Sequence, residues 1–330
     1  MHEYISEFPA HLKQAKTYLE GFDFSTLPEN KFSNVLICGL GGSGIGGKVV
    51  KDILRHELPI PVEINSNYTI PAWVNESTLL IISSYSGNTE ETLTALSEAH
   101  HQGATPVCIT SGGEVETFAK ANNATLFKVP EGYPPRAAFA FSVAYQLALF
   151  NQIFNLGKNI PGTLENISSM LIEDENSIKE RASELADTLS GTIPIIYADY
   201  EYEGIAVRFR QQINENAKML CWHHIYPEMN HNELVGWAGG NESFAVVTLL
   251  NEDDHIRNKL RMDICKSIIT KKTENFSEVE SKGETKIERT FYLVHLLDWV
   301  SEYIAQLNNV DSVEVDVISK LKSQLKQQTV

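Results

Sequence analysis

Short apolar runs alternate with helix-like segments along most of this chain of 330 residues. Buried strands of parallel sheets are runs of about four to eight apolar residues, and helical crossovers usually connect them. The alternation therefore predicts an α/β protein with two doubly wound, flavodoxin-like parallel sheets and helical arms. Strands are expected at 34–38, 61–64, 78–83, 105–110, 124–129, 193–198, 244–250 and 276–279.

The same alternation predicts how the chain is divided. A helical stretch without strands interrupts the pattern, which then restarts with a second set of strands and helices. We expect an N-terminal helical arm, a first α/β subdomain, a helical connection and a second α/β subdomain with C-terminal helices, at 1–30, 31–150, 151–190 and 191–330.

The charge balance limits the partners of the protein. With 27 Lys and Arg against 43 Asp and Glu, the formal net charge is −16. Nucleic acids and anionic membranes favour a basic face, so we expect neither as a partner. The N-terminus lacks the basic and apolar regions of a secretory signal, and we expect a cytoplasmic protein. The uncharged stretch 137–157 contains Ser142 and Gln146, which favours a buried helix over a membrane span.

A glycine-rich segment follows the first expected strand and contains Gly39, Gly41 and Gly44. Glu63 lies near the end of the next strand, 19 residues after Gly44. The minimal dinucleotide-binding pattern has two parts. Its glycines let a pyrophosphate approach the backbone closely, and its acidic residue binds a ribose hydroxyl. A dinucleotide-dependent oxidoreductase is therefore one hypothesis, and a turn that only packs strand against helix is another.

A second polar loop, Ser84 to Thr89, follows the buried strand expected at 78–83. Ser84, Ser86 and Thr89 supply three hydroxyls, Gly87 allows a tight turn, and a helix is expected to begin near residue 88. A helix cap uses one hydroxyl, whereas a phosphomonoester needs several donors. The loop therefore predicts a phosphate site, which Gly42 and Ser43 of the glycine-rich segment would share because both loops end parallel strands.

These loops carry a resemblance to the SIS (sugar isomerase) domain, and the full set of motifs resembles the bifunctional phosphoglucose/phosphomannose isomerase family. The motifs are Gly41-Gly-Ser-Gly44, Ser84 to Thr92, Pro134-Pro-Arg136, Asn214-Glu-Asn216, Pro227 to Glu233 and a lysine in the last helix. The resemblance implies two SIS subdomains, a homodimer, no metal and no cofactor. It also implies reversible isomerisation of glucose 6-phosphate, and of mannose 6-phosphate, to fructose 6-phosphate through a cis-enediol(ate).

The resemblance further assigns roles to four residues. Glu215 is expected to be the base that moves a proton between C2 and C1, and Arg136 to stabilise the enediolate. His231 is expected to open the sugar ring, supplied across the dimer interface to the site of the other subunit. Lys322 is expected to assist ring opening; because the prolines that commonly precede this helix in the family are missing here, Lys320 and Lys326 remain alternatives.

Two other hypotheses compete with this one. A zinc site is conceivable, because five candidate ligands, Cys221, His223, His224, His231 and Glu233, fall within 13 residues. Their spacing matches no closed zinc pattern. A SIS protein that binds a sugar phosphate without turning it over is the second hypothesis.

Overall fold

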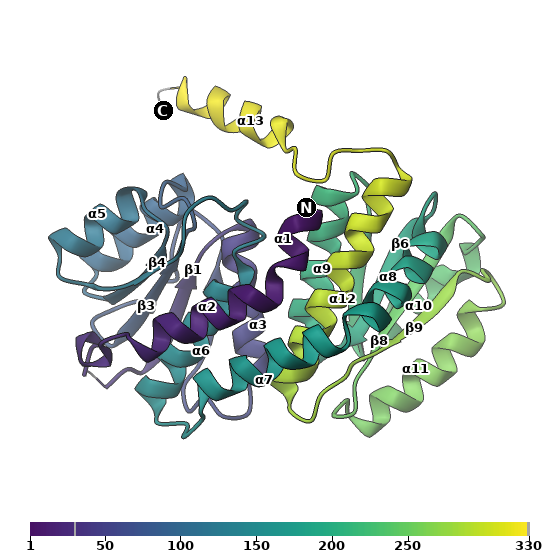
Figure 1. The fold of residues 1–330 in the computed structure, drawn as a ribbon, viewed down its shortest axis with the longest axis horizontal. Helices are drawn as coiled ribbons and strands as arrows, with labels where there is room; N and C mark the ends of the chain where they lie inside the picture. The colour runs from purple at the N-terminus through teal and green to yellow at the C-terminus, as the bar shows by residue number, and fades with distance from the viewer. Residues whose placement is uncertain (30, 329–330) are drawn as a thin grey trace.

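The computed structural model of the protein describes residues 1–29 and 31–328, without the side chain of Lys326. Two parallel sheets lie in separate halves of the molecule (Figure 1). The first has the order β2-β1-β3-β4-β5, formed by Val62–Asn65, Asn34–Cys38, Thr78–Ser83, Thr105–Thr110 and Thr125–Lys128. The second has the order β7-β6-β8-β9, formed by Trp222–Tyr226, Ile193–Asp199, Phe244–Leu250 and Phe276–Glu280. The predicted fold class is confirmed.

The first sheet is buried on both faces, which explains why its central strands are uninterrupted apolar runs. Successive side chains of a strand point to opposite faces. Val35 and Ile37 of β1 face the core that includes α3 (Gly41–Ile53) and α6 (Phe139–Phe154). Leu36 and Cys38 face α4 (Glu90–His101) and α5 (Gly113–Ala121). The uncharged stretch 137–157 forms the buried helix α6, and no helix in the described residues is long and apolar enough to cross a membrane.

The second sheet has the same sandwich design. Helices α8 (Glu175–Leu189), α9 (Glu203–Asn216) and α12 (Lys286–Leu307) share a core with one face, and α11 (Ile256–Ile269) shares a core with the other. Short elements follow β6 and β7: η2 (Tyr200–Tyr202), η3 (Glu228–His231), α10 (Glu233–Gly236) and η4 (Trp237–Gly239).

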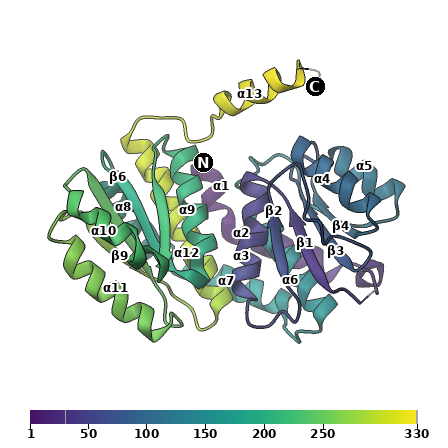
Figure 2. The ribbon, with the colours of Figure 1, turned by 180° about the vertical axis from the view of Figure 1, so that it is seen from behind.

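Helices from both ends of the chain join the two halves. The arm α1 (His2–Ser6) and α2 (Phe8–Glu20), followed by η1 (Phe24–Thr26), crosses the junction, and α7 (Ile160–Glu173) packs against both α2 and α12 (Figure 1). On the side seen in Figure 2, α3 packs against α9. There the amide of Gly204 donates to Asp52 Oδ2 at 2.7 Å, and Lys48 Nζ lies 2.7 Å from Glu203 Oε2.

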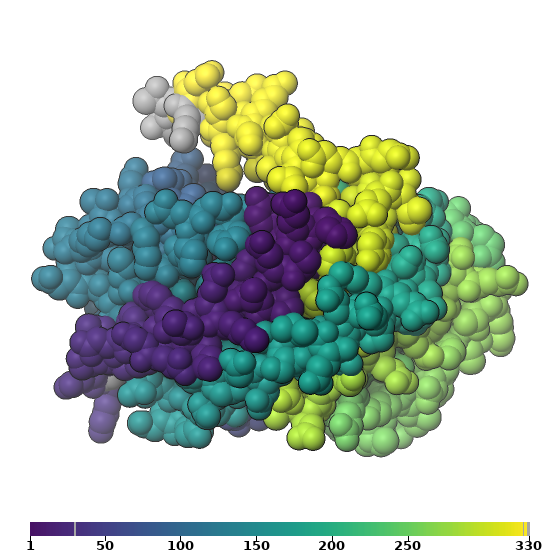
Figure 3. Space-filling view, in the orientation of Figure 1, coloured from purple at the N-terminus to yellow at the C-terminus, as the bar shows by residue number. Residues whose placement is uncertain are grey.

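Two elements differ from the expectation, and a third, the last helix, was expected but lies away from the body of the molecule. The glycine-rich segment was expected to form a loop or turn between a strand and a helix, but α3 already begins at Gly41, so this segment forms the first turns of the helix. The edge strand β7 was not predicted, because Trp222-His-His-Ile-Tyr226 is half-exposed and is not an apolar run. The last helix, α13 (Asp316–Lys326), forms as expected but projects from the body of the molecule (Figure 3).

Candidate functional site

The candidate site begins where β1 and β3 end. The strand order changes direction between these two neighbours, and such a switch point leaves a crevice at the carboxyl ends of the strands. Helix α3 begins three residues after β1, and the loop 84–89 connects β3 to α4. The first turns of two helices and both predicted anion loops therefore lie at one edge of the sheet.

The glycines of α3 are required by close backbone contacts. A Cβ atom on Gly44 would lie 2.3 Å from the carbonyl oxygen of Gly39. A Cβ atom on Gly42 would lie 2.8 Å from both the backbone nitrogen and the Cα atom of Arg136. Gly42 therefore lets the segment that carries Arg136 pack directly against the start of α3. In this way the glycine-rich motif brings Arg136 to the phosphate loops.

Hydrogen bonds connect the two loops. The amide of Tyr85 donates to Ser43 Oγ at 2.9 Å, and Ser83 Oγ donates to the carbonyl of Ser43 at 3.0 Å. Ser84 Oγ donates to Thr89 Oγ1 at 3.2 Å. Ser43, Ser84 and Thr89 are thus held by the backbone and by one another at the edge of the sheet.

The alternative role of these hydroxyls was to cap the start of α4. Thr89 is the N-cap of α4, yet its side chain makes no capping hydrogen bond with the described residues. Ser86 is exposed, and its Oγ accepts from the amide of Asn88 at 3.3 Å. Gly87 has φ +66°, and a Cβ atom there would collide with the carbonyl oxygen of Gly112. The hydroxyl groups are therefore not consumed in capping the helix.

Arg136 and Glu215 form the charged part of the site. Arg136 Nη1 lies 3.3 Å from Glu215 Oε2, and the two side chains are 4% and 27% exposed. Arg136 Nε donates to Asn216 Oδ1 at 2.8 Å, and Nη2 donates to the carbonyls of Ser312 at 2.7 Å and Val313 at 3.1 Å. Burial lowers the pKa of Arg136 below its usual value, and the charge of Glu215 opposes that change.

Further buried polar side chains hold Arg136 in place. Arg208 of α9 donates to the carbonyl of Arg136 at 3.3 Å and to Asp298 Oδ2 of α12 at 2.6 Å. Burial raises the pKa of Asp298, and Arg208 opposes the rise. Asn216, which accepts from Arg136, donates in turn to Ser301 Oγ at 2.9 Å. Arg136 is therefore held at both its backbone and its guanidinium.

Two predicted catalytic residues lie apart from this pair. His231 is exposed at the end of η3, and Lys322 is exposed on α13. Within the described part of the chain, neither residue makes a hydrogen bond or ion pair to Arg136 or Glu215. Lys320 is also exposed on α13, and the side chain of Lys326 lies outside the described residues. The structure thus brings together Arg136, Glu215 and the phosphate loops, but not His231 or the lysine.

Comparisons with known proteins match two parts of the chain. Residues 30–156 match the family model of the SIS domain, and 178–325 match the bacterial phospho-glucose isomerase C-terminal SIS domain. A bifunctional phosphoglucose/phosphomannose isomerase of Aquifex aeolicus is 36% identical, covering 89% of this chain and 91% of the relative. The protein of that name from Caldicellulosiruptor bescii is 35% identical, covering 98% of both chains. The chain belongs to the bifunctional phosphoglucose/phosphomannose isomerase family.

A solved structure agrees with the fold. The C-terminal domain of glucosamine-fructose-6-phosphate aminotransferase from Francisella tularensis superimposes with a TM-score of 0.75 at 16% identity. The match covers 94% of this chain and 97% of that chain. It supports the arrangement of two SIS subdomains in this family member.

The dinucleotide hypothesis finds no support in the geometry. Glu63 was expected near the end of its strand, where an acid could reach a ribose at the carboxyl edge. It is instead the second residue of β2, exposed and paired in register with Leu36. The acid that the pattern requires is therefore not at the edge where the two loops meet.

Of the five candidate zinc ligands, His224 and Glu233 pair with each other, whereas His223 and Cys221 contact other residues. His224 Nδ1 lies 2.8 Å from Glu233 Oε2, and His223 Nε2 lies 3.9 Å from Glu203 Oε1. Cys221 accepts a hydrogen bond from Asn214. Among the described residues, no three His, Cys, Asp or Glu side chains are grouped to hold a metal ion.

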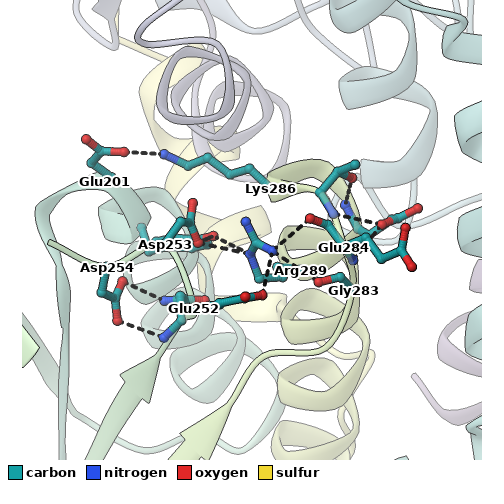
Figure 4. A network of polar contacts seen from close by, with 12 residues as sticks. Glu201, Glu252, Asp253, Asp254, Gly283, Glu284, Lys286 and Arg289 are labelled. Carbon is teal, nitrogen blue, oxygen red and sulfur yellow. Dashed lines mark hydrogen bonds and ion pairs between the residues drawn. The ribbon is translucent and has the colours of Figure 1, made fainter. Parts of the chain in front are cut away.

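The carboxyl edge of the second sheet differs from that of the first. A polar network fills it around the buried Arg289, which donates to the carbonyls of Gly283 and Glu284 at 3.1 Å (Figure 4). Arg289 Nε lies 2.9 Å from Asp253 Oδ1. The guanidinium of Arg289 is paired within this network, whereas the buried Asn251 Oδ1 and Ser281 Oγ at the same edge have no hydrogen-bond partner among the described residues.

Sequence reasoning gave no role to Asn216 and considered Glu233 only as a candidate zinc ligand. Asn216 orients Arg136, and its position directly after Glu215 in the family motif was the available signal. Glu233 accepts from Tyr197 Oη at 2.5 Å and from Trp222 Nε1 at 3.1 Å, besides its pair with His224. It ties the segment of His231 to β6 and β7, a role that the sequence could not show because β7 was not recognised.

Proposed function

We propose that the protein catalyses the reversible isomerisation of glucose 6-phosphate, and of mannose 6-phosphate, to fructose 6-phosphate. The reaction runs by ring opening and proton transfer between C2 and C1 through a cis-enediol(ate). The observation that carries this proposal is the pair of Arg136 and Glu215, 3.3 Å apart, beside two loops rich in hydroxyls and free helix amides. Membership of a family of phosphosugar isomerases supports it.

The phosphate group would bind at the loops of the first subdomain. Ser43, Ser84, Ser86 and Thr89 offer hydroxyls, the half-exposed Gly42 offers its backbone amide, and the first amides of α4 have no capping side chain among the described residues. A protein with net charge −16 must attract a phosphate dianion locally, and aligned amides at a helix start do so.

Glu215 would move the proton. In the open-chain aldose, the carboxylate takes the proton from C2 as electrons shift to the carbonyl oxygen on C1. It then returns a proton to C1 while the hydroxyl proton of O2 moves to O1, which leaves the ketone at C2. Arg136 has five N–H donors, of which three bond to Asn216, Ser312 and Val313, leaving two on Nη1, which lies 3.3 Å from Glu215 Oε2. A donor on Nη1 would stabilise the enediolate, and the rigid support of Arg136 favours electrostatic preorganisation.

His231 and Lys322 would complete the site when two chains associate. His231 is exposed at the end of η3, which suits a side chain that serves the site of a partner subunit. In this proposal the homodimer is required for ring opening, whereas Glu215 and Arg136 act within their own chain. Lys322 lies on a helix whose connecting segment is already bound to Arg136.

A coupled assay with fructose 6-phosphate tests the proposal. We expect turnover by the wild type and a loss of several orders of magnitude in kcat for Glu215→Gln, because an amide cannot take the proton. Glu180→Gln, at an exposed glutamate of α8, is the matched control and should keep full activity. An active Glu215→Gln variant would remove Glu215 from the mechanism.

Binding measurements separate the enzyme from the alternatives. A thermal shift with 6-phosphogluconate and none with NAD is expected for the isomerase. Binding without turnover of either hexose phosphate would instead identify a non-catalytic sugar-phosphate protein. Glucose and mannose 6-phosphates give the same enediol, so the ratio of their turnover rates measures how far the pocket tolerates both configurations at C2.

A further inference from the structure

Helix α13 exposes an apolar face that nothing in the described chain covers. Val317, Ile318, Leu321 and Leu325 are 78%, 38%, 56% and 46% exposed. They lie at positions i, i+1, i+4 and i+8, which form one stripe of a helix. The helix stands away from the body of the molecule in Figures 1 and 3. Such a stripe on an isolated helix indicates an interaction surface.

The segment before α13 is fixed at the candidate site. Arg136 binds the carbonyls of Ser312 and Val313, and Lys218 Nζ donates to the carbonyl of Glu314 at 2.6 Å. From this anchor α13 extends over the first half of the molecule, whereas α10 lies on the outer side of the second half (Figures 1 and 2). Within one chain, α13 therefore points away from the region that follows His231.

That region contains an apolar cavity of about 200 Å³. Its walls include Ile195, Trp222, Trp237 and Phe244, with Glu233 as the charged residue. Val235, between Glu233 and the cavity residue Gly236, is 77% exposed. An apolar cavity of about 150 Å³ accepts a benzene molecule, so this one has room for an aliphatic side chain.

A second apolar surface competes as the partner of α13. Ile256, Leu260, Ile264 and Ile268 form an exposed ridge along α11, between 36% and 72% exposed. This ridge is convex, and it is flanked by the bases Arg257, Lys259, Arg261 and Lys266 against the single acid Asp263.

Charge distinguishes the two surfaces. The described side chains of α13 include the bases Lys320 and Lys322 and one acid, Asp316. The cavity is lined by Glu233, and the exposed acids Glu228 and Glu242 belong to the segments beside it. Like charges disfavour the α11 ridge, whereas opposite charges and a concave shape favour the cavity.

We propose that the apolar face of α13 packs into the cavity between Trp222 and Trp237 of a second copy of this chain. The inference rests on the proposed function, in which His231 enters the site of the partner. Glu233 is two residues from His231, so a copy that delivers His231 also brings its cavity beside the connecting segment of α13. The docked helix would then hold Lys322 at the site that it shares with the incoming histidine.

Cross-linking between different full-length chains tests this contact. In a Cys221→Ser background the remaining cysteines, Cys38, Cys108 and Cys265, are buried. A Leu321→Cys chain is mixed with a Val235→Cys chain that carries a mass tag, and the mixture is oxidised gently. We expect a mixed disulfide. Ile172→Cys, at an exposed position of α7, replaces Val235→Cys in the control and should give none.

Self-association provides the second measurement. Leu321→Asp should weaken dimer formation by about tenfold or more in sedimentation experiments, because a charge replaces an apolar side chain in the contact. Ser319→Asp adds the same charge at an exposed polar position of α13 and should leave dimerisation unchanged.

Two cross-linking results would overturn the docking proposal: a mixed disulfide of Leu321→Cys with Ile264→Cys instead of Val235→Cys, or no mixed disulfide at all. Equal effects of Leu321→Asp and Ser319→Asp on dimer formation would also overturn it. Wild-type isomerase activity without the disulfide would refute the contact and leave the proposed function intact. The disulfide in a protein without activity would support the contact and refute the proposed function.

Discussion

At the scale of single residues, Arg136 donates to groups from two separate parts of the chain. Asn216 and Glu215 end α9, and the carbonyls of Ser312 and Val313 precede α13. A guanidinium with its donors directed in this way has little freedom to turn. The orientation of Arg136 therefore depends on Asn216, Ser312 and Val313, which have no part in the proposed proton transfer, as well as on Glu215.

Asn216→Ala tests this dependence. It leaves Arg136 Nε without its acceptor and Ser301 without its donor, so we expect the free energy of unfolding to fall by about 1–3 kcal/mol. We expect kcat to fall by about 100-fold, because a small misplacement of a catalytic group is costly. Urea unfolding measures the free energy of unfolding, and steady-state kinetics on fructose 6-phosphate measure kcat. A variant that is destabilised yet keeps kcat would show that Asn216 is only structural.

Gly42→Ala probes the contact between α3 and the segment of Arg136. The new methyl group would lie 2.8 Å from the backbone of Arg136, so one of the two segments must move. We expect a loss of about 100-fold in kcat/KM. Gly21→Ala, where the nearest atoms to the new Cβ lie 3.8 Å away, is the control. Full activity of Gly42→Ala would mean that the site tolerates the displacement.

The positions of some of these site residues could be predicted from the sequence, and those of others could not. Ser43, Ser84, Ser86 and Thr89 follow buried apolar strands, so their place at the sheet edge was predictable. The pairing of Arg136 with Glu215 was not, because it depends on how α3 and α9 of different halves pack. His231 and Lys322 were assigned by resemblance, and their roles stay predictions because they lie apart from the pair.

At the scale of elements, strands were predictable where both faces are buried. The central strands β3, β6 and β8 were found almost to the residue, because burial on both sides requires continuous apolar runs. The edge strand β7 escaped because it carries His223 and His224 on a half-exposed surface. The start of α3 was misjudged because glycine disfavours helices, and here close backbone contacts override that preference.

The segment after β7 gives a prediction at this scale. Glu233→Gln keeps one acceptor oxygen for Tyr197, Trp222 and His224, which share two in the wild type. We expect the segment of His231 to loosen, so that kcat falls while KM for fructose 6-phosphate changes little. Trp222 is part of the network, and Trp237 Nε1 donates to Tyr197 Oη at 2.9 Å, so tryptophan fluorescence should change as well.

Glu228→Gln is the matched control for this experiment. Glu228 is exposed on the same segment, and its Oε1 accepts from Asn232 at 2.9 Å. We expect this variant to keep both the activity and the fluorescence of the wild type. Equal losses of kcat in the two variants would argue against a specific role of Glu233.

At the scale of the whole molecule, the site depends on how the two halves are joined. The phosphate loops belong to the first half and Glu215 to the second, so the junction of α3 with α9 sets the distance between them. Asp52 of α3 accepts from the amide of Gly204 at this junction. Burial raises the pKa of Asp52 to about 6 from 3.8, and Lys48 opposes the rise. Folding therefore favours the protonated carboxyl.

This shift predicts how stability depends on pH. A carboxyl whose pKa is raised by folding contributes stability that is present below its unfolded pKa and lost as the pH rises through its folded pKa. For Asp52 the loss falls between about pH 4 and pH 6 and amounts to roughly 3 kcal/mol. Asp52→Asn keeps an acceptor for Gly204 and cannot ionise, so the variant should become more stable than the wild type as the pH increases.

Urea unfolding at pH 4, 5, 6 and 7 measures the difference, at one protein concentration because association also shifts stability. Near pH 4 the two proteins should have similar free energies of unfolding, and the gap should open toward pH 7. Asp187→Asn, at an exposed aspartate of α8, controls for the loss of a charge. A gap that stays constant with pH would show that the carboxyl of Asp52 ionises equally in both states, and the junction would then tolerate a buried charge.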